Sequence, residues 1–93
     1  MMSVRVTQMA ANQFVIYTND GVYFQSYNTL IARKGFDYLE DGNVRLQAGY
    51  WNNYSATTNR YLNMFLRTDG IAEIREHVAS GKYVVCENLE VVA

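Results

Sequence analysis

The chain has 93 residues, a formal net charge of −1 and 49% hydrophobic residues, which suits one folded domain, 1–93, with a single small core. This charge balance lacks the basic excess of an electrostatic nucleic-acid binder and the strong acidity of a DNA mimic. Cys86 is the only cysteine, which excludes an intrachain disulfide, and no cluster of Cys and His predicts a metal site.

The ends of the chain and its apolar runs bear on location. The first residues show no charged segment followed by an apolar one, so we predict no secretion signal. No apolar run approaches the roughly 20 residues that a membrane-spanning helix needs. We therefore expect a cytoplasmic protein.

The first half of the chain predicts short strands, because its segments alternate in polarity or are rich in β-branched and aromatic residues. The first segment carries Arg5 and Thr7 on one face, which favours a position near the edge of a sheet. The expected strands are 3–9, 13–18, 22–26, 29–33 and 44–48. In the fourth strand we expect Leu30 and Ala32 on one side and Ile31 on the other.

A hairpin is expected at Asp20-Gly21, because a type I′ turn needs positive φ at both central residues. With these two residues as the loop, Tyr17 lies opposite Phe24. A three-residue loop with Gly21 in the left-handed region would shift the pairing by one residue, and we favour the shorter loop.

The segment 34–43 is expected to be a loop, since it holds two glycines and three acidic residues. It also holds Phe36, Tyr38 and Leu39, which are unusually apolar for a loop tip. We therefore expect part of it to fold back onto the body of the protein.

An amphipathic helix follows, and Ser55 is its expected N-cap. Its apolar face should close one side of the sheet. This face consists of Thr58, Tyr61, Leu62, Phe65 and Leu66.

A second helix over 70–79 should be capped by Asp69 and end at Ser80-Gly81. Ile71, Ile74 and Val78 form its expected inner face. The chain then returns to strand over 82–92, with a break near residue 87. These elements predict an α+β fold: an antiparallel β-meander of about four to five strands with two α-helices packed on one face.

Tyr50, Trp51 and Tyr54 form an aromatic cluster before the first helix. Such a cluster can be a stacking platform for a base or a hot spot for a partner protein. It can equally be an aromatic plug between the helix and the sheet. We treat it as a candidate contact surface and leave both interpretations open.

Basic residues supply the other candidates. Arg33, Lys34 and Arg45 are expected at one end of the sheet, where they could touch a nucleic-acid backbone or simply be solvated. Arg60 lies near the start of the first helix, where free N–H groups could bind a phosphate or a carboxylate. Plain helix capping by Ser55 explains the same pattern.

No pattern predicts catalysis. Paired carboxylates, a phosphate-binding loop and a Ser/His/Asp arrangement are all missing from the sequence. A nucleophilic pair of Cys86 and His77 would need spatial contact that the sequence does not indicate. We therefore predict a protein that is not an enzyme and needs no cofactor and no metal.

Two stretches, 23–32 and 50–66, resemble a family of short uncharacterised bacteriophage proteins. Their pattern is an aromatic strand pair, F-x-S-Y-x-T-x-I-A, followed by W-x-x-(Y)-S-x-T-T-x-x-x-(L/I)-x-x-(F/W)-L. This chain differs in having Asn59-Arg60 where Ser-Lys is expected and two extra residues after Trp51. The resemblance implies a viral source and therefore the host cytoplasm as the location.

The leading hypothesis is a small non-enzymatic phage accessory protein that acts by protein–protein binding. By analogy with other small phage proteins, it could form a homodimer or inhibit or redirect a host protein, including a defence protein. The alternative is a nucleic-acid-binding regulatory protein, whose binding residues would be Arg33, Lys34, Arg45, Trp51 and Arg60.

Overall fold

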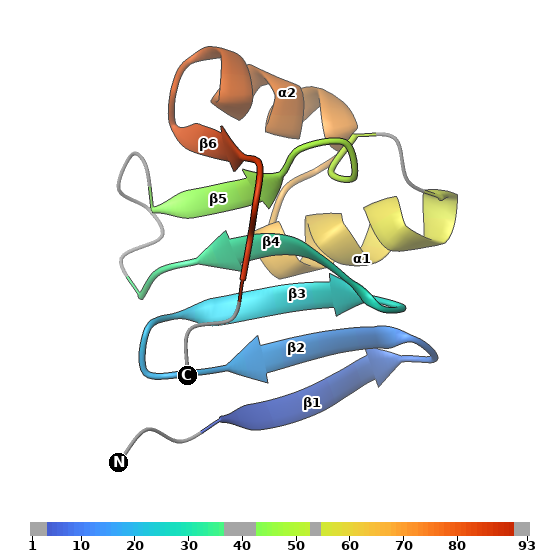
Figure 1. The fold of residues 1–93 in the computed structure, drawn as a ribbon. Coiled ribbons are helices and arrows are strands. Elements are labelled where there is room, and N and C mark those ends of the chain that lie inside the picture. The colour runs from blue at the N-terminus through green and yellow to red at the C-terminus, as the bar shows by residue number, and fades with distance from the viewer. Residues whose placement is uncertain (1–3, 37–42, 53–54, 91–93) are drawn as a thin grey trace.

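The structure, a computed structural model, describes residues 4–36, 43–52 and 55–90. In these ranges six strands form one sheet in chain order, and both helices contribute to a single core on one face of it (Figure 1). The strands are β1 Arg5–Ala10, β2 Gln13–Tyr17, β3 Val22–Ser26, β4 Thr29–Lys34, β5 Val44–Gln47 and β6 Tyr83–Cys86; the helices are α1 Ala56–Leu66 and α2 Ile71–Ala79.

The predicted α+β architecture is confirmed, with a strand count somewhat above the prediction. Strands β1 to β5 form an antiparallel meander, whereas β6 pairs parallel to β5. The parallel pair follows from the connection, because α1 and α2 carry the chain back before β6 begins.

The hairpin between β2 and β3 differs from the prediction. Tyr17 pairs with Val22, not with Phe24, because the loop consists of Asn19 and Asp20. The Thr18 amide donates to the Gly21 carbonyl at 2.9 Å, and the Thr18 hydroxyl accepts from the amides of Asp20 and Gly21 at 3.1 Å each. The Thr18 hydroxyl therefore provides a hydrogen-bond acceptor for the amides of the turn, and neither loop residue has a positive φ.

Glycine is nevertheless favoured at position 21, because the neighbouring strand leaves no room for a side chain there. A Cβ atom there would lie 2.8 Å from the backbone oxygen of Lys34 on β4. The turn therefore packs directly against the neighbouring strand.

A β-bulge in the β3–β4 pair changes which residues of β4 face the core. Phe24 pairs with Ala32 and Gln25 pairs with Leu30, which leaves Ile31 as the extra residue. Ile31 and Ala32 both belong to the core cluster. The predicted grouping of Leu30 with Ala32 is therefore wrong, because the bulge interrupts the alternation.

The predicted strand 44–48 is confirmed as β5, in which Val44 and Leu46 are buried and Arg45 is exposed. The preceding loop is less well predicted. Phe36 is 67% exposed, so it does not fold back onto the body. Tyr38 and Leu39 lie outside the described residues.

Helix α1 begins and packs as predicted. The Ser55 hydroxyl accepts a hydrogen bond from the Thr58 amide at 3.2 Å. Thr58, Leu62, Phe65 and Leu66 are buried, and Tyr61 is partly buried against the core. The helix is fixed to β3 by Phe65 stacked on Phe24, with ring centroids 5.7 Å apart, and by a buried 2.7 Å hydrogen bond between the hydroxyls of Ser26 and Thr58.

Helix α2 also buries its predicted face, with Ile74 in the core and Ile71 and Val78 packed against it. Its N-cap is Gly70, not Asp69. The capping carboxylate is instead that of Glu73, which reaches back to accept from the Asp69 amide at 3.1 Å.

The last strand ends at Cys86, next to the predicted break near residue 87. The described residues after the break are not strand, and residues 91 and 92 of the predicted range 82–92 lie outside the described residues. The described residues after Cys86 cross the face of the sheet that the helices do not cover (Figure 1). The Gln47 side chain holds them there by donating to the Glu87 carbonyl and accepting from the Leu89 amide, each at 2.7 Å.

Candidate protein-binding surface

The helices cover the sheet unevenly. Helix α1 packs mainly on β3 and β4, and α2 packs on β6, so β1 lies beyond both. The side chains of Val4 and Val6 are 48% and 57% exposed. The β1 side of the molecule is therefore open to a partner.

The outer edge of β1 also presents backbone groups that pair with no other strand among the described residues. The amide of Thr18, directly after β2, donates its hydrogen bond toward β3. Successive residues of a strand direct their backbone groups to opposite sides, so the backbone groups of Val15 and Tyr17 bond toward β1. Their partners Thr7 and Arg5 use their backbone groups within the sheet. Val6 lies between them, so its N–H and C=O point away from the sheet, where another strand can pair.

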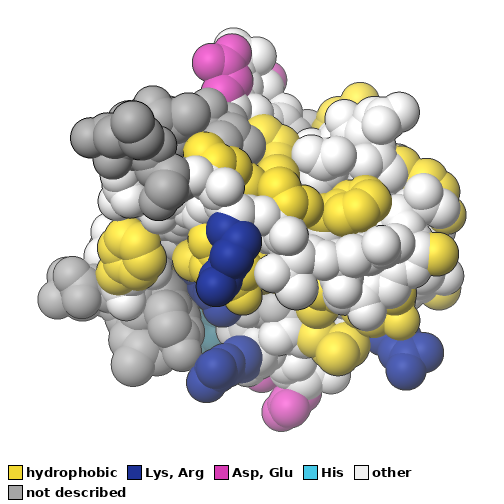
Figure 2. Space-filling model, turned by 90° about the horizontal axis from the view of Figure 1, so that it is seen from below, with side chains coloured by type: hydrophobic (Ala, Val, Ile, Leu, Met, Phe, Trp, Pro, Cys, Tyr) yellow, Lys and Arg dark blue, Asp and Glu magenta, His cyan; other side chains and the backbone are white. Residues whose placement is uncertain are grey.

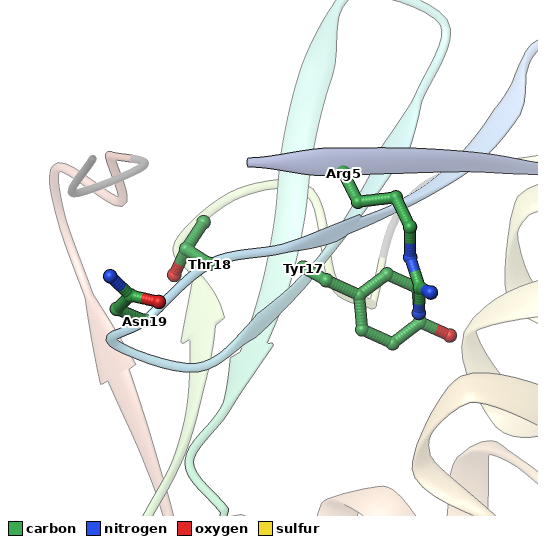
Figure 3. A pocket seen from close by; sticks show the side chains of 4 residues that line it. All are labelled: Arg5, Tyr17, Thr18 and Asn19. Carbon is green, nitrogen blue, oxygen red and sulfur yellow. The ribbon is translucent and has the colours of Figure 1, made fainter. Parts of the chain in front are cut away.

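Arg5 and Tyr17 shape the helix side of this edge. The Arg5 guanidinium carbon lies 4.4 Å from the centre of the Tyr17 ring, a cation–π contact visible in Figure 3. The two side chains border a hollow of about 230 Å³, together with Thr18 and Asn19 of the β2–β3 turn.

A second hollow lies between this part of the sheet and the C-terminal end of α1. Its volume is about 310 Å³, and Tyr17 borders both hollows. We call it the Tyr17 groove; it is lined by Val15, Tyr17, Val22, Lys34, Met64, Phe65 and Arg67.

Lys34 ties this groove to α1. Its ammonium donates to the Phe65 carbonyl at 2.7 Å and lies 4.5 Å from the centre of the Phe65 ring. Burial lowers the pKa of Lys34, and the nearby positive charge of Arg67 lowers it further. The groove is therefore lined by two cationic side chains, Lys34 and Arg67, at the end of the helix, where positive charge is favoured.

The aromatic candidates separate in the structure. Trp51 is only 8% exposed and belongs to the core cluster, which is the position of an aromatic plug. Tyr50 is 43% exposed. Tyr54 lies outside the described residues.

The basic candidates do not form one patch. Arg33 and Arg45 are cross-strand partners, whereas Lys34 faces α1 on the opposite side of the sheet. Arg60 lies on α1, 5.6 Å from the centre of the Tyr61 ring.

Arg33 is also engaged within the fold. It donates to the Asp20 carboxylate at 3.2 Å and to the Asp20 carbonyl at 2.8 Å. The Tyr23 hydroxyl donates to the same carboxylate at 2.9 Å. The Tyr23 hydrogen bond is the largest cause that lowers the pKa of Asp20, followed by Arg33. The ion pair therefore fixes the β2–β3 turn to β4.

The remaining candidate sites from the sequence, the start of α1 and the pair of His77 and Cys86, have simple structural roles. The Ser55 hydroxyl is used in capping α1. His77 bonds to Glu73 at 3.2 Å and packs on the Tyr83 ring, so the His77 ring serves the packing of α2 against β6. Across the described ranges, no group of three or more His, Cys, Asp or Glu could hold a metal ion. No helix in the same ranges is long and apolar enough to span a membrane.

Sequence reasoning missed Arg5, Tyr17, Met64 and Arg67 as surface candidates. Met64 carried the clearest signal, because it is an apolar residue on the polar side of the predicted helix, and it is 56% exposed. The other three come from separate elements, so only the fold brings them to one place.

Comparison with known proteins gives a family but no activity. A family of unknown function (DUF8033) matches residues 1–81, a range that includes β1, α1 and every residue lining the two hollows. No curated protein and no solved structure matches the chain.

Proposed function

The chain belongs to the DUF8033 family, and we propose that it is a non-enzymatic protein-binding module that pairs the edge of β1 with a strand of its partner. The observation that carries the proposal is the open edge at Val6, where outward backbone groups coincide with an exposed apolar side chain. Addition of a strand to a free sheet edge is a common way for proteins to bind extended segments.

The identity of the partner is part of the proposal. The resemblance to short bacteriophage proteins favours a host protein in the host cytoplasm, and a second copy of the chain would use the same edge in a homodimer. Two antiparallel β1 strands related by a twofold axis would extend the sheet across the dimer.

Nucleic-acid binding has weaker support. Its proposed residues lie on both faces of the sheet, and Arg33 is committed to Asp20. Trp51, the proposed stacking residue, is buried in the core. The geometry therefore favours a protein partner.

Val6→Pro tests the edge directly. Proline removes the outward N–H of Val6 but no hydrogen bond of the β1–β2 ladder, and proline is tolerated at such edge positions. Val6→Ala is the matched control, because it shortens the side chain and keeps the N–H.

The variants are compared by sedimentation velocity and by affinity capture from bacterial lysate. We expect self-association or capture of a discrete protein by the wild type, weakened by Val6→Ala and lost with Val6→Pro. Thermal unfolding should show both variants folded. A monomeric wild type that captures nothing, or capture that Val6→Pro retains in full, would contradict the proposal.

A further inference from the structure

The Tyr17 groove combines an apolar lining with positive charge. Val15 and Phe65 belong to the core cluster and Val22 packs against it, so the inner wall is apolar. Met64 and Tyr17 lie at its more exposed side, 56% and 36% exposed. An apolar side chain of a ligand would replace water along these walls.

The charges around the groove have one sign. Lys34 and Arg67 line it, and Arg5 borders the adjoining hollow across Tyr17. No Asp or Glu is among the described residues lining either hollow. The ion pairs of the described ranges, Arg33–Asp20 and His77–Glu73, include neither Arg5 nor Arg67.

The view of the β1 side agrees with this charge distribution. Figure 2 shows hydrophobic side chains next to Lys and Arg near the middle of this face, and Asp and Glu only at its margins. A ligand that fits this face carries negative charge beside an apolar group.

The size and shape of the groove narrow the ligand class. Its volume of about 310 Å³ is at the lower end of ligand pockets, enough for a side chain and not for a large cofactor. Arg5 covers one face of the Tyr17 ring, which leaves that face unavailable for stacking with a base. Arg5 is also a residue of β1, so the groove adjoins the edge where the proposed partner strand pairs.

We propose that the Tyr17 groove binds an acidic segment of a partner protein, in which a large apolar side chain enters the groove and a neighbouring carboxylate contacts the Arg67 guanidinium. The proposal rests on the protein-binding function above and adds the chemistry of the segment that is bound.

The test begins with a random-peptide display library selected on the full chain. The selected peptides should carry Asp or Glu next to Phe, Trp, Leu or Ile. A fluorescein-labelled synthetic copy of the strongest binder then gives dissociation constants by fluorescence anisotropy for the wild type and each variant.

Two variants address the groove. Arg67→Gly removes the guanidinium at a position with φ of 59°, a conformation that glycine adopts without strain, so the fold should be retained. Met64→Glu places a negative charge at the more exposed wall. Each should weaken peptide binding at least about tenfold, the scale of a lost charge-assisted contact. Arg45→Gln, which removes a similar charge from the other face, should leave it unchanged.

Three results would overturn the groove assignment. The selected peptides could lack the acidic and apolar combination, or bind Arg67→Gly and Met64→Glu as tightly as the wild type. Labelled single-stranded DNA could bind in place of the peptides and be released by Arg67→Gly. Peptide binding lost with Val6→Pro and kept by both groove variants would reject the groove and leave the β1 proposal intact.

Discussion

The buried hydroxyl pair of Ser26 and Thr58 offers a quantitative test of how α1 is held to the sheet. Both side chains are fully buried, and their oxygens are 2.7 Å apart. Thr58→Val keeps the shape of the side chain and leaves the Ser26 hydroxyl without this partner. An unsatisfied buried polar group costs about 1–3 kcal/mol, so we expect a loss of about 2 kcal/mol in the free energy of unfolding.

Ser26→Ala should cost less, about 1 kcal/mol, because the Thr58 hydroxyl keeps a second neighbour in Ser55, whose Oγ lies 3.2 Å away. The double variant removes both hydroxyls, so no buried hydroxyl of this pair is left without its partner. Its loss in the free energy of unfolding should be about 1 kcal/mol smaller than the sum of the two single losses. Thr57→Val is the matched control, since it makes the same change at an exposed position in the same helical turn.

Urea unfolding monitored by circular dichroism measures these energies. The slope of the free energy against urea should stay constant across the set, so that midpoints report stability alone. Losses that simply add in the double variant, or a Thr57→Val variant that loses as much as Thr58→Val, would refute the assigned hydrogen bond.

Phe65→Ala should lower the free energy of unfolding by about 3–5 kcal/mol, measured by urea unfolding, because a buried ring in the core is lost; a wild-type midpoint would contradict its placement. Gly21→Ala should destabilise the fold and lower the melting temperature, since the added Cβ meets a β4 carbonyl at 2.8 Å; an unchanged melting temperature would argue against this contact. The Asp20 carboxylate has a lowered pKa in the fold, so its stabilisation is present above the unfolded pKa and fades as the pH falls through the folded value. Asp20→Asn should therefore reduce the loss in the free energy of unfolding between neutral and acidic pH, measured by urea unfolding. The same loss in the variant as in the wild type would reject the ion pair. Thr7→Pro should lower the melting temperature more than Val6→Pro does, because only the Thr7 amide bonds to β2; the reverse order would reject the assigned edge geometry.

Helix α1 was predictable because its information is local. A helix places every third or fourth residue on one face, so Thr58, Leu62 and Phe65 identify the buried side without knowledge of the rest of the fold. The cap at Ser55 is local as well. The strands of the meander were likewise apparent from short alternating segments between turns.

The features of the sheet that were predicted wrongly, or not predicted, depend on single interactions or on the path of the whole chain. The register of the β2–β3 hairpin is set by the Thr18 hydroxyl, which caps a turn that Asp20-Gly21 alone does not identify. The bulge at Ile31 interrupts a simple alternation. The parallel pairing of β6 depends on the path of both helices, which no local pattern encodes.

The candidate surface was predicted less well than the fold. Arg33 and Lys34 are neighbours in one strand, and successive strand residues point to opposite faces, so they could not form one patch. Of the two interpretations of Trp51, its burial in the core cluster agrees with the aromatic plug. Tyr17 belongs to β2, whereas Met64 and Arg67 belong to the C-terminal end of α1, and their meeting follows only from the packing of α1 on the sheet.

The most direct test of β1 pairing is amide hydrogen exchange, measured residue by residue in the free chain and in the complex or dimer that it forms. We expect fast exchange of the Val6 amide in the free chain and strong protection of it on binding, with the Arg5 and Thr7 amides protected in both states. A Val6 amide that is already protected in the free chain, or that exchanges equally fast in the bound state, would contradict it.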